Sequence, residues 1–474
     1  MTGVSEGMTM TTERGEAYRA WLKGRQVLVV GLARSGVAAC RLLVASGARV
    51  VGTDTKPLDA LGSGVGALRE SGVELVVGGH PARVFEEVDL VVLSPGVPLT
   101  LSPLAAARRR EIPIIGELEL AYRVMEAEFI AVTGTNGKTT TTALVGALLA
   151  QEVRHLLVGG NIGNPLTAHA LEFPAHGLTV AEVSSFQLET IETFRPRVAA
   201  VLNLTPDHVD RHGSFEAYRQ AKARIFLNQT RADWAVLNAD DAEVAAFAKR
   251  TLARVVFFSR RRPLDEGVSL REGWIVWRLD GREIGIAPVE EIFLRGDHNV
   301  ENVLAASACA LWAGVAPSRL RTAIGTFRGV AHRIEWVREL GGVAYYNDSK
   351  GTNVASTLRA LESFHEPVVL IAGGRGKGQD FTALASAARG RVRVAILLGE
   401  DQAKLEAVLG PTTKVIRVHG MTEAVALAQR VAAPGDVVLL SPACASFDMF
   451  RDFEERGEVF KAAVLALEER SRDA

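Results

Sequence analysis

The sequence predicts an α/β fold in three domains: a Rossmann-like N-terminal domain (residues 1–116), a central P-loop domain (residues 117–329) and a Rossmann-like C-terminal domain (residues 330–474). Three observations predict this fold. The chain has 474 residues, whereas a single hydrophobic core stops growing at roughly 250 to 300 residues. Runs rich in β-branched residues alternate with helical patterns along most of the chain. One such run leads directly into a Gly-rich loop that contains lysine and threonine, Gly134-Thr-Asn-Gly-Lys-Thr-Thr140.

The composition limits the kinds of protein this chain can be. It has 48% hydrophobic residues, 23% charged residues and 45 glycines, which is typical of a globular α/β enzyme. The formal net charge of −1 gives no field that would draw the molecule onto nucleic acid or an anionic membrane. The three cysteines are widely spaced and lack a C-x-x-C pattern, as expected in a reducing compartment. Residues 1–16 are polar and no apolar run approaches about 18 residues, so we expect a cytoplasmic protein without a signal peptide or membrane span.

The N-terminal domain opens with a βαβ pattern. Gln26–Val30 is an expected strand, Gly31-Leu-Ala-Arg-Ser-Gly36 a turn that starts a helix, and Arg49–Gly52 a second strand that ends near Asp54. In dinucleotide-binding folds, an acid about 20 residues after the glycine turn binds a ribose hydroxyl. Ala33 stands where the dinucleotide fingerprint has its second glycine, so a nicotinamide cofactor is only one alternative for this domain.

The alternation continues into the central domain. Leu90–Leu93 is expected to be a strand that ends at Ser94-Pro-Gly96, and the first domain boundary is placed near Gly116. Phe129–Val132 is then the strand that leads into the Gly-rich loop. Further along, Trp274–Arg278 and Glu283–Ile286 flank Leu-Asp-Gly-Arg, which predicts a β-hairpin. Strand and helix patterns resume in the C-terminal domain, with strands expected at residues 368–372, 394–398 and 437–440.

The Gly-rich loop has the residue types that a nucleotide's phosphates require. Backbone N–H groups of such a loop and of the following helix N-terminus point at anionic oxygens. Lys138 would neutralise the phosphates, and the Thr139 hydroxyl could bind Mg²⁺. The alternative is an ordinary turn that caps a helix. We therefore expect ATP to bind the residues Gly134, Thr135, Asn136, Gly137, Lys138, Thr139 and Thr140.

Acidic and imidazole side chains follow two other strands of the same domain. Glu182 ends an apolar run at residues 178–180, and Asp207-His-Val-Asp-Arg-His212 follows a strand expected over Ala199–Leu204. The carboxyl ends of parallel strands are where ligands bind. Glu182 could therefore bind Mg²⁺ or could simply be solvated, and His208 and His212 are competing candidates for a second ligand.

Lys222 lies in an unusual position for a lysine. It falls four residues after Tyr218, inside the apolar stripe of a helix expected over Phe215–Phe226. Burial favours the neutral amine, which is the form that reacts with CO₂ to give a carbamate, an anionic metal ligand. The alternative is that the side chain extends along the helix to reach solvent.

Three polar loops follow strands of the C-terminal domain. They are Asn347-Asp-Ser-Lys-Gly-Thr-Asn353, Gly373-Gly-Arg-Gly-Lys377 and Ser441-Pro-Ala-Cys-Ala-Ser-Phe-Asp448. Each loop alone could be an ordinary polar turn with no role in binding. Together at one edge of a parallel sheet, their donors suit a substrate with several carboxylates.

Taken in order, these motifs resemble the Mur ligase family, ATP-dependent amide-forming enzymes of peptidoglycan synthesis. The resemblance rests on the Gly134–Thr140 loop, Glu-Val-Ser-Ser-Phe-Gln187, Asp207-His-Val-Asp-Arg211, Tyr-Arg-Gln-Ala-Lys222 and His298-Asn-Val-Glu-Asn302, and it covers nearly the whole chain. Within the family, the three C-terminal loops are most similar to those of enzymes that add D-glutamate to UDP-N-acetylmuramoyl-L-alanine.

The resemblance implies a role for each motif residue. Lys138, Glu182, His208 and Lys222 would be catalytic. Two Mg²⁺ ions would bind Thr139, Glu182, His208 and the CO₂-derived carbamate of Lys222. Asn302 and Arg333 would complete the ATP site. The UDP-linked substrate would bind Arg34, Ser35, Asp54, Thr55, Ser94, Pro95, Gly96, Asn161 and Gln187. D-Glutamate would bind Lys350, Thr352, Lys377, Ser446, Phe447 and Phe453.

The implied partners are therefore ATP, UDP-N-acetylmuramoyl-L-alanine and D-glutamate, bound by a cytoplasmic monomer. ATP would phosphorylate the alanyl carboxylate, and the D-glutamate amine would displace phosphate from the acyl phosphate. Three alternatives remain on sequence alone: another amino-acid-adding ligase, such as one of folate metabolism, a nicotinamide-dependent oxidoreductase, and a non-catalytic nucleotide-binding regulator.

Overall fold

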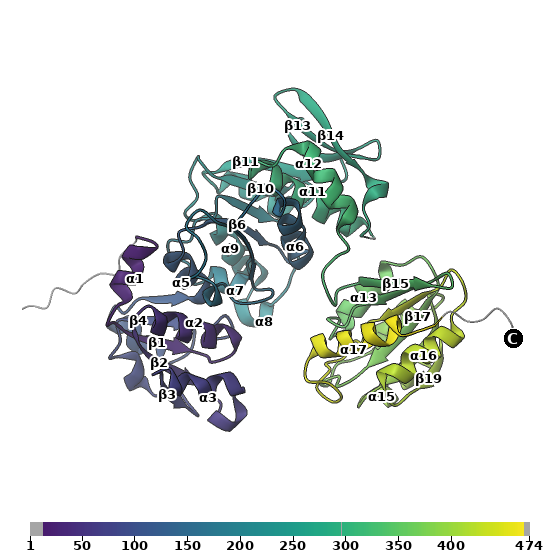
Figure 1. Ribbon diagram of the computed structural model, residues 1–474, viewed down its shortest axis with the longest axis horizontal. Coiled ribbons are helices and arrows are strands. Elements are labelled where there is room, and N and C mark those ends of the chain that lie inside the picture. Colours follow the sequence, from purple (N-terminus) through teal and green to yellow (C-terminus); the bar gives the residue numbers. More distant parts are fainter. Residues whose placement is uncertain (1–12, 295, 469–474) are drawn as a thin grey trace, which may run out of the picture. The chain divides into compact units, whose positions relative to one another are not determined.

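The computed structural model describes residues 13–294 and 296–468 and contains three β-sheets (Figure 1). The chain forms two compact units. The first contains the residues up to Glu291 together with Val300–Gly325, and it holds a five-stranded and a nine-stranded sheet. The second contains Ile292–Asn299 and the residues from Thr326 onward, and it holds a six-stranded sheet. The α/β class predicted from the sequence is confirmed, and the three sheets agree with the three expected domains.

The five-stranded sheet is entirely parallel, with strand order β3-β2-β1-β4-β5. Its strands are β1 (Gln26–Val30), β2 (Arg49–Asp54), β3 (Glu74–Val77), β4 (Leu90–Leu93) and β5 (Ile114–Gly116). The helices are α1 (Glu16–Leu22), α2 (Arg34–Ala45), α3 (Ser63–Glu70), α4 (Leu104–Arg109) and α5 (Glu117–Val124), with 3₁₀ turns η1 (Leu58–Ala60) and η2 (Ala82–Phe85). The order reverses between β1 and β4, so the loops after these two strands border the crevice where such sheets bind ligands.

The nine-stranded sheet has the order β14-β13-β12-β11-β10-β9-β6-β8-β7. Its strands are β6 (Glu128–Thr133), β7 (Leu156–Gly160), β8 (Leu178–Glu182), β9 (Val198–Val201), β10 (Trp234–Asn238), β11 (Arg254–Ser259), β12 (Gly267–Arg271), β13 (Trp274–Leu279) and β14 (Arg282–Pro288). The strands from β7 to β12 are parallel, and β12, β13 and β14 are antiparallel. The hairpin predicted around Leu279–Arg282 is therefore confirmed as β13–β14.

Helices and short 3₁₀ turns lie between these strands or follow β14. They are α6 (Lys138–Leu149), α7 (Ser185–Leu188), α8 (Val209–His212), α9 (Phe215–Ala223), α10 (Ala242–Ala245), α11 (Asp297–Trp312), α12 (Pro317–Thr326), η3 (Leu166–Ala168), η4 (Arg224–Phe226), η5 (Ala246–Lys249) and η6 (Val289–Glu291). The strand expected over Ala199–Leu204 is shorter, because β9 ends at Val201 and the next residues turn to hold the phosphate loop.

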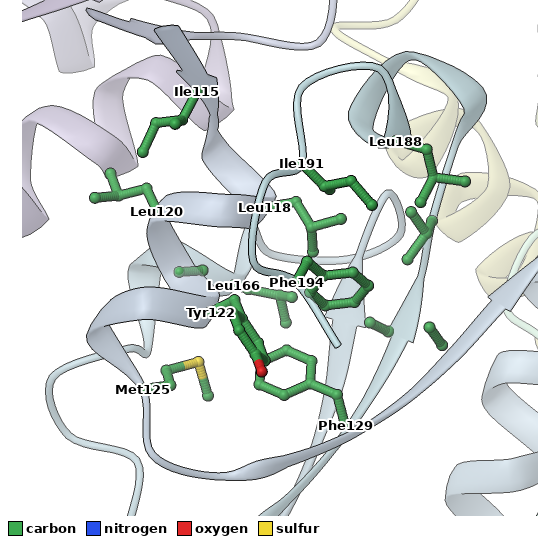
Figure 2. Packing of buried hydrophobic residues seen from close by; sticks show 14 of the residues in the cluster. Ile115, Leu118, Leu120, Tyr122, Met125, Phe129, Leu166, Leu188, Ile191 and Phe194 are labelled. Atoms are coloured by element: carbon green, nitrogen blue, oxygen red, sulfur yellow. The ribbon is translucent and has the colours of Figure 1, made fainter. Parts of the chain in front are cut away.

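The first two sheets share one hydrophobic core, which is organised around α5 (Figure 2). All eight residues of this helix are buried. The rings of Tyr122, Phe129 and Phe194 meet edge to face, with centroids 5.2–5.6 Å apart. The predicted boundary between residues 116 and 117 thus falls at the start of a helix that packs in this shared core, and it stays a prediction.

The six-stranded sheet of the second unit has the order β15-β16-β20-β17-β18-β19. Its strands are β15 (Glu335–Leu340), β16 (Val343–Asn347), β17 (Val368–Gly373), β18 (Val392–Leu398), β19 (Lys414–Arg417) and β20 (Val437–Leu440), and its helices are α13 (Val354–Glu362), α14 (Thr382–Ala388), α15 (Gln402–Leu409), α16 (Met421–Val431) and α17 (Phe453–Leu465). Only β15 is antiparallel to its neighbour. Alternate residues of β17 face the two core layers: Leu370 packs with α13–α15, and Val369 and Ile371 with α16 and α17.

Within residues 13–294 and 296–468, no helix is both long enough and apolar enough to span a bilayer. The expectation that residues 1–12 carry no signal peptide lies outside the described residues.

Candidate functional site

The phosphate loop connects β6 to the N-terminus of α6, as predicted. Gly134 (φ 150°) and Gly137 (φ 81°) have backbone angles that side chains rarely adopt. A Cβ at Gly137 would also lie 2.3 Å from Oδ1 of Asn302. The two glycines are therefore required by the backbone path of the loop itself, and this path leaves the first N–H groups of α6 directed outward from the helix end.

A second loop, which follows β9, holds the phosphate loop in place. The side chain of Asn203 accepts a hydrogen bond from the Asn136 N–H (2.8 Å) and donates one to the Asn136 carbonyl (3.2 Å). The Thr135 hydroxyl lies 3.0 Å from the Tyr218 hydroxyl and accepts from the Thr205 N–H at 3.0 Å. The loop is thus held by protein contacts alone. Asn203 was not identified from the sequence, since a single asparagine after a strand carries no distinctive signal.

The Lys138 side chain folds back over the loop. Its Nζ donates to the carbonyl oxygens of Gly134 (2.9 Å) and Thr135 (2.8 Å). Lys138 is the first residue of α6, so its ammonium lies beside the helix N-terminus, where anions are favoured. A phosphate at this position would be a stronger partner for the ammonium than the two carbonyls are.

Glu182 ends β8, directly beside β6. The side chain is 2% exposed, and its Oε1 accepts from Asn161 Nδ2 at 2.7 Å. Its Oε2 is buried and has no hydrogen-bond partner among the described residues. A buried carboxylate oxygen without a partner is costly, so this oxygen fits a position that a cation completes. Asn161, expected at the UDP-linked substrate, here orients Glu182.

Lys222 is buried, not extended to solvent. It is 1% exposed, and its Nζ donates to the Gly134 carbonyl (2.9 Å) and to Thr133 Oγ1 (3.2 Å), beneath the phosphate loop. Burial lowers the pKa of Lys222 well below its ordinary value, and the positive charge of Lys138 lowers it further, whereas Asp207 and Glu182 oppose the shift. This environment favours the neutral amine over the ammonium.

The two histidines after β9 have different environments. His208 has a left-handed backbone (φ 51°), its side chain is 48% exposed, and its Nε2 lies 3.7 Å from the Asp207 carboxylate. The His212 side chain is 1% exposed and is held between Glu189 and Ser185, at 3.1 and 3.0 Å. Of the two candidates, only His208 is accessible to a bound ion.

The side chains near the phosphate loop could bind Mg²⁺ only if several different kinds of ligand group are combined. In the part of the chain that the structure describes, no three His, Cys, Asp or Glu side chains converge on one point. A magnesium site here would need the Thr139 hydroxyl and a modified Lys222 beside Glu182 and His208. Mg²⁺ also keeps several waters and binds substrate phosphates, so few protein ligands suffice.

The predicted residues of the first sheet lie at or after the carboxyl ends of its strands and at the start of α2. The Asp54 carboxylate accepts from the N–H groups of Leu32 (2.8 Å) and Lys56 (3.0 Å), and the Ser94 hydroxyl donates to the Gly31 carbonyl (2.7 Å). Arg34 reaches the central sheet, where Nη2 donates to the Gly163 carbonyl at 2.6 Å. Ser35, Thr55, Pro95 and Gly96 lie in the same loops and the start of α2.

Gln187 is fixed by a buried acid that sequence reasoning missed. Its Oε1 accepts from the Ser184 N–H (2.9 Å), and its Nε2 donates to Glu117 Oε1 (2.7 Å). Glu117 is 2% exposed and its Oε2 has no partner among the described residues. Burial raises the pKa of Glu117 to about 7.

This raised pKa predicts a pH-dependent effect of Glu117→Gln. The pKa of Glu117 rises from an ordinary 4.5, so the stability that its neutral form contributes is fully present below about pH 4.5 and is lost as the pH rises through about 7. Relative to wild type, Glu117→Gln should therefore gain roughly 3 kcal/mol of stability between pH 4.5 and pH 8. Urea unfolding at several pH values measures this gain. A difference between Glu117→Gln and wild type that does not change with pH would contradict the prediction.

Asn302 lies behind the phosphate loop. It is 5% exposed, sits on α11, and its Oδ1 accepts from the Thr141 hydroxyl at 3.2 Å. This places it beside the nucleotide loop, as expected of an ATP-site residue. Its role in binding ATP stays a prediction.

In the second unit, the three predicted polar loops meet at one edge of the sheet. They follow the adjacent strands β16, β20 and β17. Ser441 Oγ donates to Asp348 Oδ2 (2.8 Å), and Arg375 and Ala445 exchange two backbone hydrogen bonds at 2.9 and 3.0 Å. Burial raises the pKa of Asp348 to about 7, and Arg333, expected at the nucleotide, acts electrostatically on this acid.

Five of the six residues expected to bind D-glutamate lie on these loops, and the sixth, Phe453, begins α17. Lys350 and Lys377 place their Nζ atoms over the rings of Phe453 (5.6 Å) and Phe447 (5.3 Å). Phe447 is 58% exposed and Ser446 is 2% exposed. Thr352 lies in the first loop, where its N–H donates to the Lys350 carbonyl. The structure therefore brings two cations and two aromatic rings to the same edge.

Arg456, on α17, binds two of these loops at once. It was not identified from the sequence. It is 2% exposed, and its guanidinium donates to Ser349 Oγ (2.9 Å), the Ser349 carbonyl (2.7 Å) and the Cys444 carbonyl (3.0 Å). An arginine in an amphipathic helix is usually solvated, so no local pattern distinguishes it.

Comparison with known proteins assigns all three parts of the chain to one family. Family models match residues 25–116 (Mur ligase MurD-like, N-terminal domain), 132–310 (Mur ligase middle domain) and 332–444 (Mur ligase, glutamate ligase domain). The chain is 50% identical over 445 residues to a UDP-N-acetylmuramoylalanine--D-glutamate ligase from Pelotomaculum thermopropionicum, covering 94% of this chain and 98% of the relative. It is 47% identical over 447 residues to the ligase of the same name from Acidobacterium capsulatum, covering 94% and 97%.

A solved structure supports the fold independently. The MurF ligase from Thermotoga maritima, determined in complex with ADP, matches with a TM-score of 0.56 at 15% identity, over 96% of this chain and 98% of that one. At this identity the match concerns the fold alone. The sequence matches extend over both compact units and the phosphate loop, and they show that this chain belongs to the Mur ligase family.

Proposed function

We propose that this chain is an ATP-dependent ligase that joins D-glutamate to UDP-N-acetylmuramoyl-L-alanine, with release of ADP and phosphate. The observation that carries the proposal is the match at 47–50% identity over 94% of the chain to ligases named for that reaction. The geometry agrees with it, since a phosphate loop lies in the first unit and a cationic, aromatic cluster lies at the strand ends of the second. We further propose a cytoplasmic monomer.

The proposed ligand sites follow the motif residues. ATP phosphates would bind the loop from Gly134 to Thr140, with Asn302 and Arg333 at the rest of the nucleotide. The UDP-linked substrate would bind the crevice of the first sheet, through the residues Arg34, Ser35, Asp54, Thr55, Ser94, Pro95, Gly96, Asn161 and Gln187. D-Glutamate would bind Lys350, Thr352, Lys377, Ser446, Phe447 and Phe453, whose ammonium groups suit its two carboxylates.

Thr139, Glu182, His208 and a carbamate on Lys222 would hold two Mg²⁺ ions. Bound there, Mg²⁺ would offset the negative charge of the ATP phosphates. The unpartnered Glu182 Oε2 and the buried Lys222 amine support this set. Carbamate formation joins the neutral Lys222 nitrogen to the carbon of CO₂ and releases one proton.

The reaction needs activation of a carboxylate, because a free carboxylate resists attack by an amine. An oxygen of the alanyl carboxylate attacks the γ-phosphorus of ATP, and the bond to the ADP oxygen breaks. The D-glutamate ammonium loses a proton, and the resulting amine attacks the acyl carbon. Phosphate leaves with the bonding electrons, and the nitrogen's second proton passes to the released phosphate. Lys138 would stabilise charge on the transferring phosphoryl group, and exclusion of water would protect the acyl phosphate.

The proposal predicts selectivity for one amino acid. With ATP, Mg²⁺ and UDP-N-acetylmuramoyl-L-alanine, D-glutamate should accelerate phosphate release by at least about 10²-fold over glycine or L-alanine, because these lack a second carboxylate and would leave one of the site's cations unpaired. L-Glutamate and meso-diaminopimelate should also be slower, because neither can place its amine and both carboxylates as D-glutamate does. Equal rates with several amino acids would indicate another amino-acid-adding ligase. ATP binding without phosphate release from the complete mixture would indicate a regulator, and tight NADH binding without ATP hydrolysis would indicate an oxidoreductase.

A further inference from the structure

Helix α8 lies between two parts of the proposed site, and its two ends are fixed. It is a single helical turn, with left-handed residues on both sides, His208 (φ 51°) and Gly213 (φ 80°). Backbone hydrogen bonds close this turn: the N–H groups of Arg211 and His212 donate to the His208 carbonyl (3.1 and 3.0 Å), and the Gly213 N–H donates to the Val209 carbonyl (2.8 Å). A displacement of one α8 side chain therefore shifts the others, including the His208 ring that precedes the helix.

Arg211 attaches this helix to the first sheet. Its Nη1 donates to the Gly96 carbonyl at 3.3 Å, and its Nη2 donates to the Val97 carbonyl at 2.8 Å. These carbonyls belong to the loop after β4, which is itself closed by the Val97 N–H to Ser94 carbonyl bond and by the Ser94 hydroxyl to Gly31 carbonyl bond. The guanidinium therefore binds the loop after β4 directly, and the Ser94 hydroxyl links that loop to the loop after β1.

The same helix is attached to α7 by a compact set of contacts. Arg211 lies 4.9 Å over the Phe186 ring and forms an ion pair with Glu189 at 4.0 Å. The Phe186 ring also contacts the rings of His208 (4.9 Å between centroids) and His212 (5.3 Å, nearly parallel). The other oxygen of Glu189 lies 3.1 Å from His212 Nδ1. Phe186 and Glu189 therefore hold Arg211, His208 and His212 in one arrangement.

Resting on the proposed function, we propose that Arg211 is a positioning residue that couples the UDP-linked substrate's loop at Ser94–Val97 to the placement of His208 at the nucleotide's phosphates. When the substrate orders the loop at Ser94–Val97, the two carbonyls that Arg211 binds would be fixed in position. Through α8, this would also fix the position of the His208 imidazole. Each ligand would then strengthen the binding of the other by the same factor, as linkage requires. A lysine could not replace the arginine fully, because one ammonium lacks the planar fork that binds two carbonyls at once.

The test is the coupling between the two ligands in the full-length protein. Calorimetry gives the Kd of a non-hydrolysable ATP analogue with Mg²⁺, alone and with saturating UDP-N-acetylmuramoyl-L-alanine. In wild type the Kd should fall by a factor within the usual range of about 5 to 150. In Arg211→Met the factor should approach 1, with the Kd of the analogue alone changed by less than about 3-fold, and Arg211→Lys should be intermediate.

The controls separate coupling from folding and from the proposed function. Arg219→Met is the matched variant, since Arg219, with a side chain 18% exposed, also forms ion pairs, with Glu216 and Glu243, but among the described residues makes no hydrogen bond or ion pair with the loop at Ser94–Val97, and its loss should leave the factor unchanged. If Arg211 had only a structural role, its substitution would lower the melting temperature and weaken the binding of both ligands, but the ratio of the two Kd values would not change. The inference is overturned if folded Arg211→Met keeps the wild-type factor, or if the factor in wild type is 1. If Arg211→Met does not fold, a wild-type factor in Arg211→Lys overturns it. Absence of phosphate release from wild type with all three substrates overturns the proposed function instead.

Discussion

Lys222→Ala is expected to lose on the order of 10²- to 10³-fold in the rate of phosphate release, as when one preorganised electrostatic group is removed from an active site. Short-chain carboxylates such as acetate should restore part of this rate. The physical reason is the burial of the side chain, which is 1% exposed and lies under the Gly134 carbonyl. In the alanine variant, a small carboxylate can enter the space that the lysine side chain occupied and supply the anionic oxygens of the proposed carbamate.

Two measurements separate the carbamate from a structural role of Lys222. With ¹³C-bicarbonate, the wild-type protein should show a carbamate carbon resonance that Lys222→Ala lacks. The exposed Lys249 provides the matched control, and Lys249→Ala should keep wild-type activity and show no response to acetate. Wild-type activity of Lys222→Ala, or an equal effect of acetate on both variants, would contradict the carbamate.

The sequence predicted the parts of the fold whose signal is local. The buried strands β1, β4 and β20 begin and end at the predicted residues, because a β-branched run between turn residues leaves few alternatives. The position of Lys222 on an apolar stripe likewise predicted its burial. Since parallel strands end at one edge, the loops after β16, β17 and β20 could be expected together before their order was known.

The residues that sequence reasoning missed depend on contacts far apart in the chain. The segment of α5, Glu-Leu-Glu-Leu-Ala-Tyr-Arg, has alternating charges that would suit a solvated face, yet the whole helix is buried between two sheets. Asn203, Arg211 and Arg456 each bind carbonyl or amide groups of another loop, and nothing in their own neighbourhood indicates those partners. Tertiary packing decided these positions, so only the folded chain shows them.

The buried acid of α5 has a large expected effect on stability. Glu119 is 0% exposed, and its two oxygens accept from Arg123 Nε (2.7 Å), the Thr193 hydroxyl (2.6 Å) and the N–H groups of Glu192, Thr193 and Phe194 (2.8–3.0 Å). Its partner Arg123 is 1% exposed. One carboxylate therefore fixes the segment after α7 against the helix that the first two sheets share.

Glu119→Ala should lower the free energy of unfolding by about 3–5 kcal/mol, because it removes the buried carboxylate partner of Arg123, whose guanidinium keeps its ion pair with the half-exposed Glu192 at 2.8 Å. The variant also leaves buried N–H groups without acceptors, which adds to the cost. Glu126→Ala is the matched control: its carboxylate is 44% exposed and pairs with Arg19 at 3.8 Å, so its loss should cost less than about 1 kcal/mol. Urea unfolding followed by tryptophan fluorescence measures both. Similar values for the two variants would mean that the Glu119 network does not hold the shared core together, and that the apolar packing around Phe194 suffices.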